Sequence, residues 1–162
     1  MTVVDQLLTA NRAYAGRAPV VTGARPTRQV AVVTCMDARI DVFAALGLQL
    51  GDAHVIRNAG GRVTGDVLRS LALSSHVLRV ATVVVMQHTK CGLAGVSDAE
   101  LRARTGADLA FHPIDDHVAA LRADVDTLTA TPFLGPVCEV AGLIYDVDTG
   151  GIDDIVRWRR PG

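Results

Sequence analysis

The sequence predicts an α/β fold: a mostly parallel central sheet flanked by helices. Two short β-branched runs, QVAVVT at 29–34 and ATVVVMQ at 81–87, indicate buried strands. Segments with apolar residues at helical spacing lie between the strand candidates, and strands that alternate with helices form right-handed βαβ units. The 162 residues fit one domain better than two, so we expect a single domain over 1–162.

The chain begins with an expected helix over Val3–Tyr14, which ends at Gly16. A connector containing Pro and Arg follows as far as Thr27. This connector is long and polar for the interior of a domain. We therefore expect residues 1–27 to be a helical arm that packs on a partner subunit.

The centre of the chain carries the strands of the expected parallel sheet. After the strand at 29–34 we expect, in order, a short helix capped by Asp41 and ended by Gly47, a strand at 54–57, a helix from the N-cap Thr64 to Arg79, and the strand at 81–87.

The last third of the chain predicts two helices and a hairpin. Ser97 and Glu100 have capping-box spacing, and a second helix is expected over 115–129. Residues 137–146 and 152–157 then form two strands around a tight turn, which gives an antiparallel hairpin at the sheet edge. Within it we expect Cys138 to be a small buried hydrophobe.

Charge and cysteine content exclude several classes of function. The chain has 16 basic and 17 acidic residues without a block of one sign, so we expect neither a nucleic acid nor a membrane partner. The longest apolar run, 80–86, is too short to span a bilayer. Met1–Asp5 lacks the pattern of an export signal, and three cysteines favour reduced thiols over a disulfide framework. We expect a cytoplasmic protein.

Soft metal ligands follow two of the predicted strands. Cys35 comes directly after the first and His88 directly after the third, with Cys91 three residues further on and followed by Gly92. The carboxyl ends of parallel strands meet at one edge of a sheet, where ligands collect. Two thiolates and an imidazole suit Zn²⁺, and three protein ligands leave the open fourth position of a catalytic site. Gly92 is expected to let backbone approach without a Cβ clash.

Asp37 and Arg39 stand beside the first ligand. The Asp37 carboxylate can reach the open position of the metal or accept a hydrogen bond from a bound hydroxide, and Arg39 can clamp it bidentately and hold it off the metal. The alternative is a surface ion pair without a function.

Three motifs carry a family resemblance. Cys35-x-Asp37-x-Arg39, then residues 57–61 (RNAGG), then His88-Thr89-x-Cys91-Gly92 resemble the signatures of β-class carbonic anhydrases, in a compact bacterial form.

The resemblance implies reversible hydration of CO₂ to bicarbonate by attack of zinc-bound hydroxide, with one Zn²⁺ per chain. It implies that Cys35, His88 and Cys91 bind zinc, that Asp37 and Arg39 form a catalytic dyad, and that Asp37 can close onto the metal as a conditional fourth ligand. We assign Gly60 and Gly92 to the substrate pocket. Family members with a bicarbonate-inhibition pocket carry Trp where this chain has Val32, so we expect no such pocket beside Arg57. The family implies a homodimer or homotetramer.

Three other functions remain open at this point. Zinc hydroxide attacks any small linear heterocumulene, so the substrate could be carbonyl sulfide or carbon disulfide. A zinc-binding module without turnover needs a fourth firm ligand, whereas Asp37 is expected to be restrained by Arg39. A phosphatase with Cys35 as nucleophile is disfavoured, because Cys35 and Arg39 are too close for a phosphate loop.

Overall fold

The computed structural model describes residues 1–21 and 23–161; Thr22, in the predicted connector, lies outside the described residues. The helices are α1 (Val3–Ala15), α2 (Val42–Leu46), α3 (Gly65–His76), α4 (Asp98–Thr105) and α5 (His117–Ala130), with 3-10 turns η1 (Ala59–Gly61) and η2 (Pro132–Leu134). The strands are β1 (Val30–Cys35), β2 (Ala53–Asn58), β3 (Thr82–His88), β4 (Glu139–Tyr145) and β5 (Ile152–Arg159).

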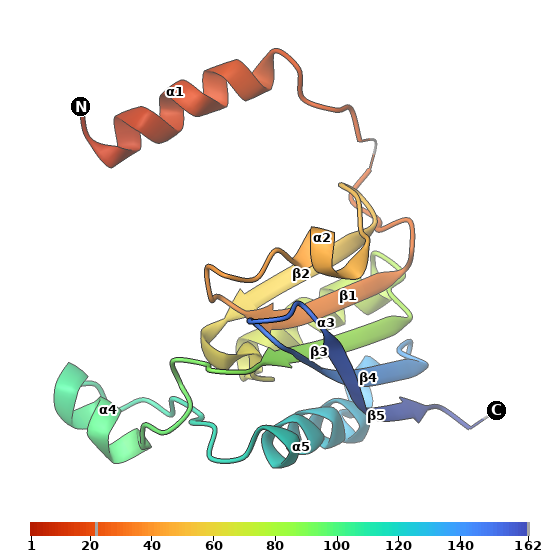
Figure 1. The fold of residues 1–162 in the computed structure, drawn as a ribbon. Helices are drawn as coiled ribbons and strands as arrows, with labels where there is room; N and C mark the ends of the chain where they lie inside the picture. Colours follow the sequence, from red (N-terminus) through yellow and green to blue (C-terminus); the bar gives the residue numbers. More distant parts are fainter. Residues whose placement is uncertain (22, 162) are drawn as a thin grey trace.

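One five-stranded sheet organises the chain, with strand order β2-β1-β3-β4-β5 (Figure 1). The first four strands are parallel to their neighbours, and β5 runs antiparallel to β4. The predicted α/β class, the mostly parallel sheet and the C-terminal edge hairpin are confirmed. Because Thr34 of β1 lies opposite Met86 of β3, the carboxyl ends of these strands reach the same edge of the sheet.

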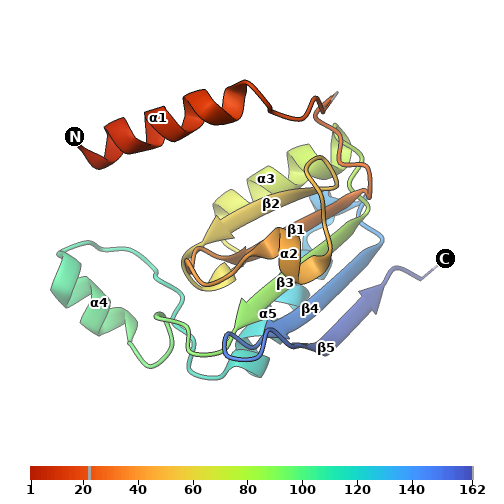
Figure 2. The same ribbon diagram turned by 45° about the horizontal axis from the view of Figure 1, so that its top comes forward.

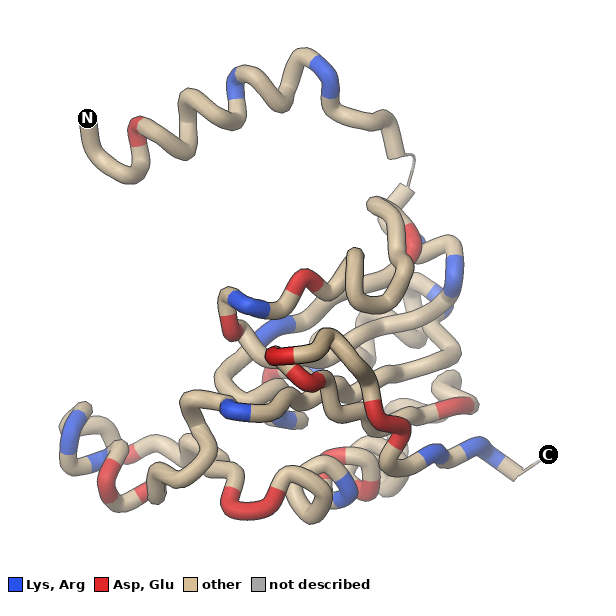
Figure 3. Tube along the Cα trace, viewed as in Figure 1, with Lys and Arg blue, Asp and Glu red and all other residues tan. Residues whose placement is uncertain are grey.

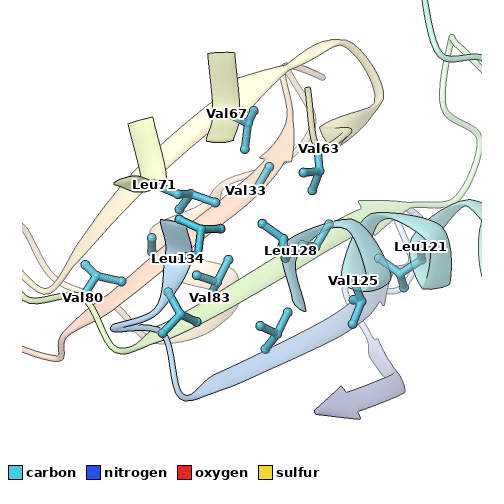
Figure 4. Packing of buried hydrophobic residues seen from close by; sticks show 14 residues of the cluster. Val33, Val63, Val67, Leu71, Val80, Val83, Leu121, Val125, Leu128 and Leu134 are labelled. Atoms are coloured by element: carbon cyan, nitrogen blue, oxygen red, sulfur yellow. The ribbon is translucent and has the colours of Figure 1, made fainter. Parts of the chain in front are cut away.

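The two faces of the sheet are covered differently. Helices α3 and α5 pack on one face, where branched aliphatic side chains of the helices and strands form the larger core (Figure 4). The other face carries a smaller cluster around Val32, Met86 and Ile114, to which the short α2 and several connecting segments contribute. Because both faces of the sheet are covered, successive residues of the central strands are buried, which explains why these strands are continuous apolar runs in the sequence.

Several predicted boundaries shift by a few residues. Cys35 and His88 are the last residues of their strands instead of the first residues beyond them. The helix after Thr64 ends at His76 and not at Arg79, since Arg79 has a left-handed backbone (φ 61°) that a helix cannot contain. The Thr64 side chain makes no capping hydrogen bond to the described residues.

The prediction for Cys138 is wrong. The residue precedes β4 and its side chain is exposed. Cys138 lies in the segment between η2 and β4, where the side chain of the neighbouring Val137 points into the core instead. The Cys138 thiol donates to the Ala81 carbonyl across 3.4 Å.

Helix α1 stands clear of the sheet and its helices in both views (Figures 1 and 2). Thr2 and Asp5 form a capping box at its start, and every residue of the helix is exposed, including the apolar Val3, Val4, Leu7 and Leu8. Helix α4 also projects from the body (Figure 2).

Acidic and basic residues are interspersed along the fold (Figure 3), as the sequence indicates. Within 1–21 and 23–161, no helix combines the length and the apolar character that crossing a bilayer requires.

Candidate metal centre

Three buried side chains meet at the carboxyl edge of the sheet. Cys35 ends β1, His88 ends β3, and Cys91 lies in the turn that follows. The two sulfur atoms are 3.9 Å apart, and the ligand atoms of all three residues lie within 4.8 Å of one another. The left-handed backbone of Lys90 (φ 53°) turns the chain sharply, which lets Cys91 face the same point as His88. Residues far apart in the sequence thus form one compact S,S,N group.

His88 is prepared to act as a metal ligand. Its Nδ1 lies 2.9 Å from the Thr89 carbonyl oxygen, which can only accept, so Nδ1 carries the proton and Nε2 keeps its lone pair. Burial lowers the pKa of His88, which favours the neutral imidazole that metals bind. Nε2 is buried and has no hydrogen-bond partner among the described residues. A buried lone pair without a partner, facing two sulfur atoms, fits a zinc ion.

The cysteines of the group are reduced and free. Burial raises the pKa of the Cys91 thiol above its usual value. In the metal-free protein this thiol therefore keeps its proton, which a metal must displace on binding.

Asp37 lies against the group and is held there by Arg39. Arg39 donates from Nε to Oδ1 (2.9 Å) and from Nη2 to Oδ2 (2.8 Å), the bidentate clamp that the spacing predicts. The same Nη2 donates to the Lys90 carbonyl, which ties the clamp to the turn before Cys91. Oδ2 of Asp37 is 3.9 Å from Nε2 of His88. The hydrogen bonds from Arg39 hold the pKa of Asp37 well below its usual value.

Arg57 braces the loop that carries Asp37. Its guanidinium donates to the backbone carbonyls of Cys35, Asp37 and Ile40, across 2.9, 2.7 and 3.3 Å. Three bonds from one rigid group fix the loop from the end of β1 onwards.

The glycines of η1 allow close packing beside Cys35. A Cβ on Gly61 would lie 2.9 Å from the Cys35 backbone nitrogen, and the residue has a left-handed backbone (φ 64°). A Cβ on Gly60 would lie 2.8 Å from Leu93 Cδ2. Both positions therefore require glycine.

A pocket of about 280 Å³ opens beside the metal group. Its lining residues are Cys35, Met36, Asp37, Ala59, Gly60, Cys91, Gly92 and Leu93. Gly60 and Gly92, the two glycines assigned to the substrate pocket, both border this pocket. The steric reason given for Gly92 is wrong, since a Cβ there would meet nothing within 4 Å among the described residues.

A buried polar network behind this edge was not predicted from the sequence. Gln87, Arg62 and Asp124 are hydrogen-bonded to one another through the carboxylate of Asp124. One signal was available: Gln87 is the polar residue that closes an otherwise apolar strand run, directly before His88.

Known proteins resemble this chain over most of its length. The carbonic anhydrase family model matches residues 30–131. β-Carbonic anhydrase 1 of Mycobacterium tuberculosis (strain ATCC 25618 / H37Rv) is 34% identical over 161 residues, which cover 96% of this chain and 99% of that protein. The crystal structure of a carbonic anhydrase from Streptococcus mutans superimposes with a TM-score of 0.88 at 39% identity, covering 96% of this chain and 99% of the other.

Two further similarities are weaker, one in the length that it covers and the other in sequence identity. A carbon disulfide hydrolase of Acidianus sp. (strain A1-3) is 40% identical over 81 residues, which cover 50% of this chain and 40% of that protein. Tetrameric β-carbonic anhydrases of Sordaria macrospora share the fold, with a TM-score of 0.70 at 20% identity over 96% of this chain and 98% of the other. The family match, the full-length relatives and the shared fold lead to one conclusion: this chain belongs to the β-class of the carbonic anhydrase family.

Proposed function

We propose that this enzyme catalyses the reversible hydration of CO₂ to bicarbonate and a proton, with one Zn²⁺ per chain held by Cys35, His88 and Cys91. The observation that carries the proposal is the buried group of two thiols and a neutral imidazole whose Nε2 has no other partner in the described chain. Membership of the carbonic anhydrase family supports the same reaction.

The ligand types favour zinc, and the number of protein ligands is typical of a catalytic site. Two sulfurs and one nitrogen form a soft set, and three protein ligands leave a fourth position for a small molecule. When bound, zinc acidifies water and so supplies a nucleophile at neutral pH.

Asp37 and Arg39 are proposed to orient the reacting water. The carboxylate is kept ionised by Arg39, and its Oδ2 faces the metal group, so it can accept a hydrogen bond there. We also propose the carboxylate as a conditional fourth ligand in a closed state. That movement needs the bidentate bonds from Arg39 to break, which disfavours the closed state while the clamp holds.

Gly60 and Gly92 are proposed to form the substrate wall of the pocket together with Leu93. CO₂ is linear and nonpolar, and it needs apolar surface close to the nucleophile more than it needs hydrogen bonds. The absence of a side chain on both glycines leaves that surface accessible.

Residues 1–27 are proposed to be an arm that packs on a second copy in a homodimer or homotetramer. The support is the apolar surface of α1, which is exposed in the single chain. A cytoplasmic location is proposed from chemistry, because a site built on two free thiols requires a reducing compartment.

The test is stopped-flow CO₂ hydration across pH on zinc-loaded protein, with metal content measured on the same sample. We expect one zinc per chain and a rate that rises with pH, because bound zinc would acidify the reacting water. Parallel assays with carbon disulfide and carbonyl sulfide separate the alternative substrates. Zinc without turnover of any of the three would leave a non-catalytic zinc module and overturn the proposal.

A further inference from the structure

A buried carboxylate joins three segments behind the metal edge. Asp124 of α5 is 4% exposed and accepts hydrogen bonds from side chains and backbone of distant segments. Arg62 donates from Nε to Oδ2 (2.7 Å), Gln87 donates from Nε2 to Oδ2 (3.0 Å), and the backbone N–H of Val63 donates to Oδ1 (3.2 Å). Buried charge is costly unless it is paired, and here an arginine and two further donors satisfy it.

The first branch of this network ends beside a metal ligand. Gln87 is fully buried and immediately precedes His88 on β3. Side chains of neighbouring strand residues point to opposite faces, so Gln87 anchors the strand to α5 on one face while His88 points into the metal group on the other. Any rotation of the strand end at Gln87 displaces the imidazole.

The second branch reaches the glycine turn and the pocket wall. The Asn58 side chain accepts from the Arg62 backbone N–H (2.9 Å) and donates to its carbonyl (2.8 Å), which closes the turn containing Gly60 and Gly61. The Arg62 guanidinium also donates to the carbonyls of His112 (2.8 Å) and Pro113 (3.2 Å). The next residue, Ile114, is buried and would meet a Cβ on Gly60 at 3.3 Å.

We infer that Asp124 is a positioning residue, which sets His88 through Gln87 and the glycine turn beside Cys35 through Arg62. The network touches neither substrate nor metal. It acts by holding two of the ligands at the separation that one ion requires, in the way that outer hydrogen bonds orient ligands in metal sites. The inference rests on the proposed zinc site.

Gln87→Met tests the first branch and separates positioning from stability. Oε1 of Gln87 is buried without a partner among the described residues, so Met removes an unsatisfied acceptor as well as the bond to Asp124. We expect an unchanged or higher melting temperature together with about 10–100-fold weaker zinc binding, measured by chelator competition. The thiolate charge-transfer bands of the cobalt(II)-loaded protein should also shift. Gln49→Met, at an exposed position, is the matched control and should change neither.

Asp124→Asn tests the carboxylate that joins the two branches. The control is Asp66→Asn, which changes the exposed ion pair with Arg69. We expect weaker zinc binding and an altered cobalt spectrum for the Asp124 variant alone. If Gln87→Met and any folded Asp124 variant bind zinc like the parent chain and give the parent cobalt spectrum, the network is only structural and the inference is overturned. If the parent chain itself binds no zinc, the failure belongs to the proposed function.

Discussion

The metal edge and helix α1 are opposite extremes of the same chain. At the metal edge Cys35, His88 and Cys91 are buried, and the surrounding loops are held by Arg39 and Arg57. In α1 every residue is exposed, although Leu7 and Leu8 are apolar and expose 64% and 53% of their surface. The side chains of the metal edge are buried and hydrogen-bonded within one chain, whereas α1 exposes apolar surface that no other described part of the single chain covers.

The difference teaches which properties belong to one chain and which need a second copy. Metal binding should depend on the edge residues and the hydrogen bonds behind them within one chain, whereas the arm should matter for assembly. Four experiments test that division.

Cys35→Ser should have the largest effect. Oxygen is a poorer ligand than thiolate for zinc in this set, so zinc and CO₂ hydration should be lost together. Metal analysis and stopped-flow assays on the same preparation check this. Cys138→Ser removes the exposed cysteine and should leave both intact. A Cys35 variant with full zinc and full rate contradicts the ligand assignment.

Asp37→Ala should separate binding from rate. The variant should keep zinc, because the three ligands remain, and should lose about 10²-fold in kcat, the size of the loss when a reacting group is no longer held in position. Metal content and kcat measured across pH report the two effects. Full activity in this variant would remove Asp37 from the reaction.

The double variant Leu7→Ala/Leu8→Ala should weaken assembly with little effect on zinc content. Alanine keeps the helix, and each lost side chain should cost about 2 kcal/mol at a buried interface, or roughly 30-fold in the dissociation constant. Light scattering over a concentration series measures the change, with Asn11→Ala as the exposed polar control. An unchanged oligomer would show that α1 does not form the interface.

Zinc affinity should rise with pH in the range below the thiol pKa. The pKa of Cys91 is raised by burial, so the metal-free protein holds a proton that zinc must displace. Each proton that zinc displaces strengthens binding about tenfold per pH unit, and the contribution from Cys91 vanishes above the pKa of its thiol. Chelator competition at several pH values measures this slope. The same slope in the Leu7/Leu8 variant would confirm that the metal edge works independently of the arm.

Much of this organisation could be predicted from local patterns. The apolar runs ending at Cys35 and His88 identify parallel strands and the edge where their ends meet, and the spacing of Asp37 and Arg39 predicts the clamp. Patterns of neighbours do not reveal contacts between distant polar residues, which explains why the bonds from Arg62 and Gln87 to Asp124 were missed. Cys138 was misplaced because an apolar neighbourhood does not say which of two adjacent residues, Val137 or Cys138, turns inward.

The origin of the three ligands also constrains the order of folding. His88 and Cys91 are close in the sequence and can meet in a local turn, but Cys35 and Cys91 are 56 residues apart and come together only when β1 and β3 pair. Closing so long a loop is entropically costly before the sheet exists. An unfolded or nascent chain therefore offers an ion only two ligands, His88 and Cys91, and binds it weakly. The complete site forms late, after β1 and β3 have paired, and metal binding then stabilises the sheet.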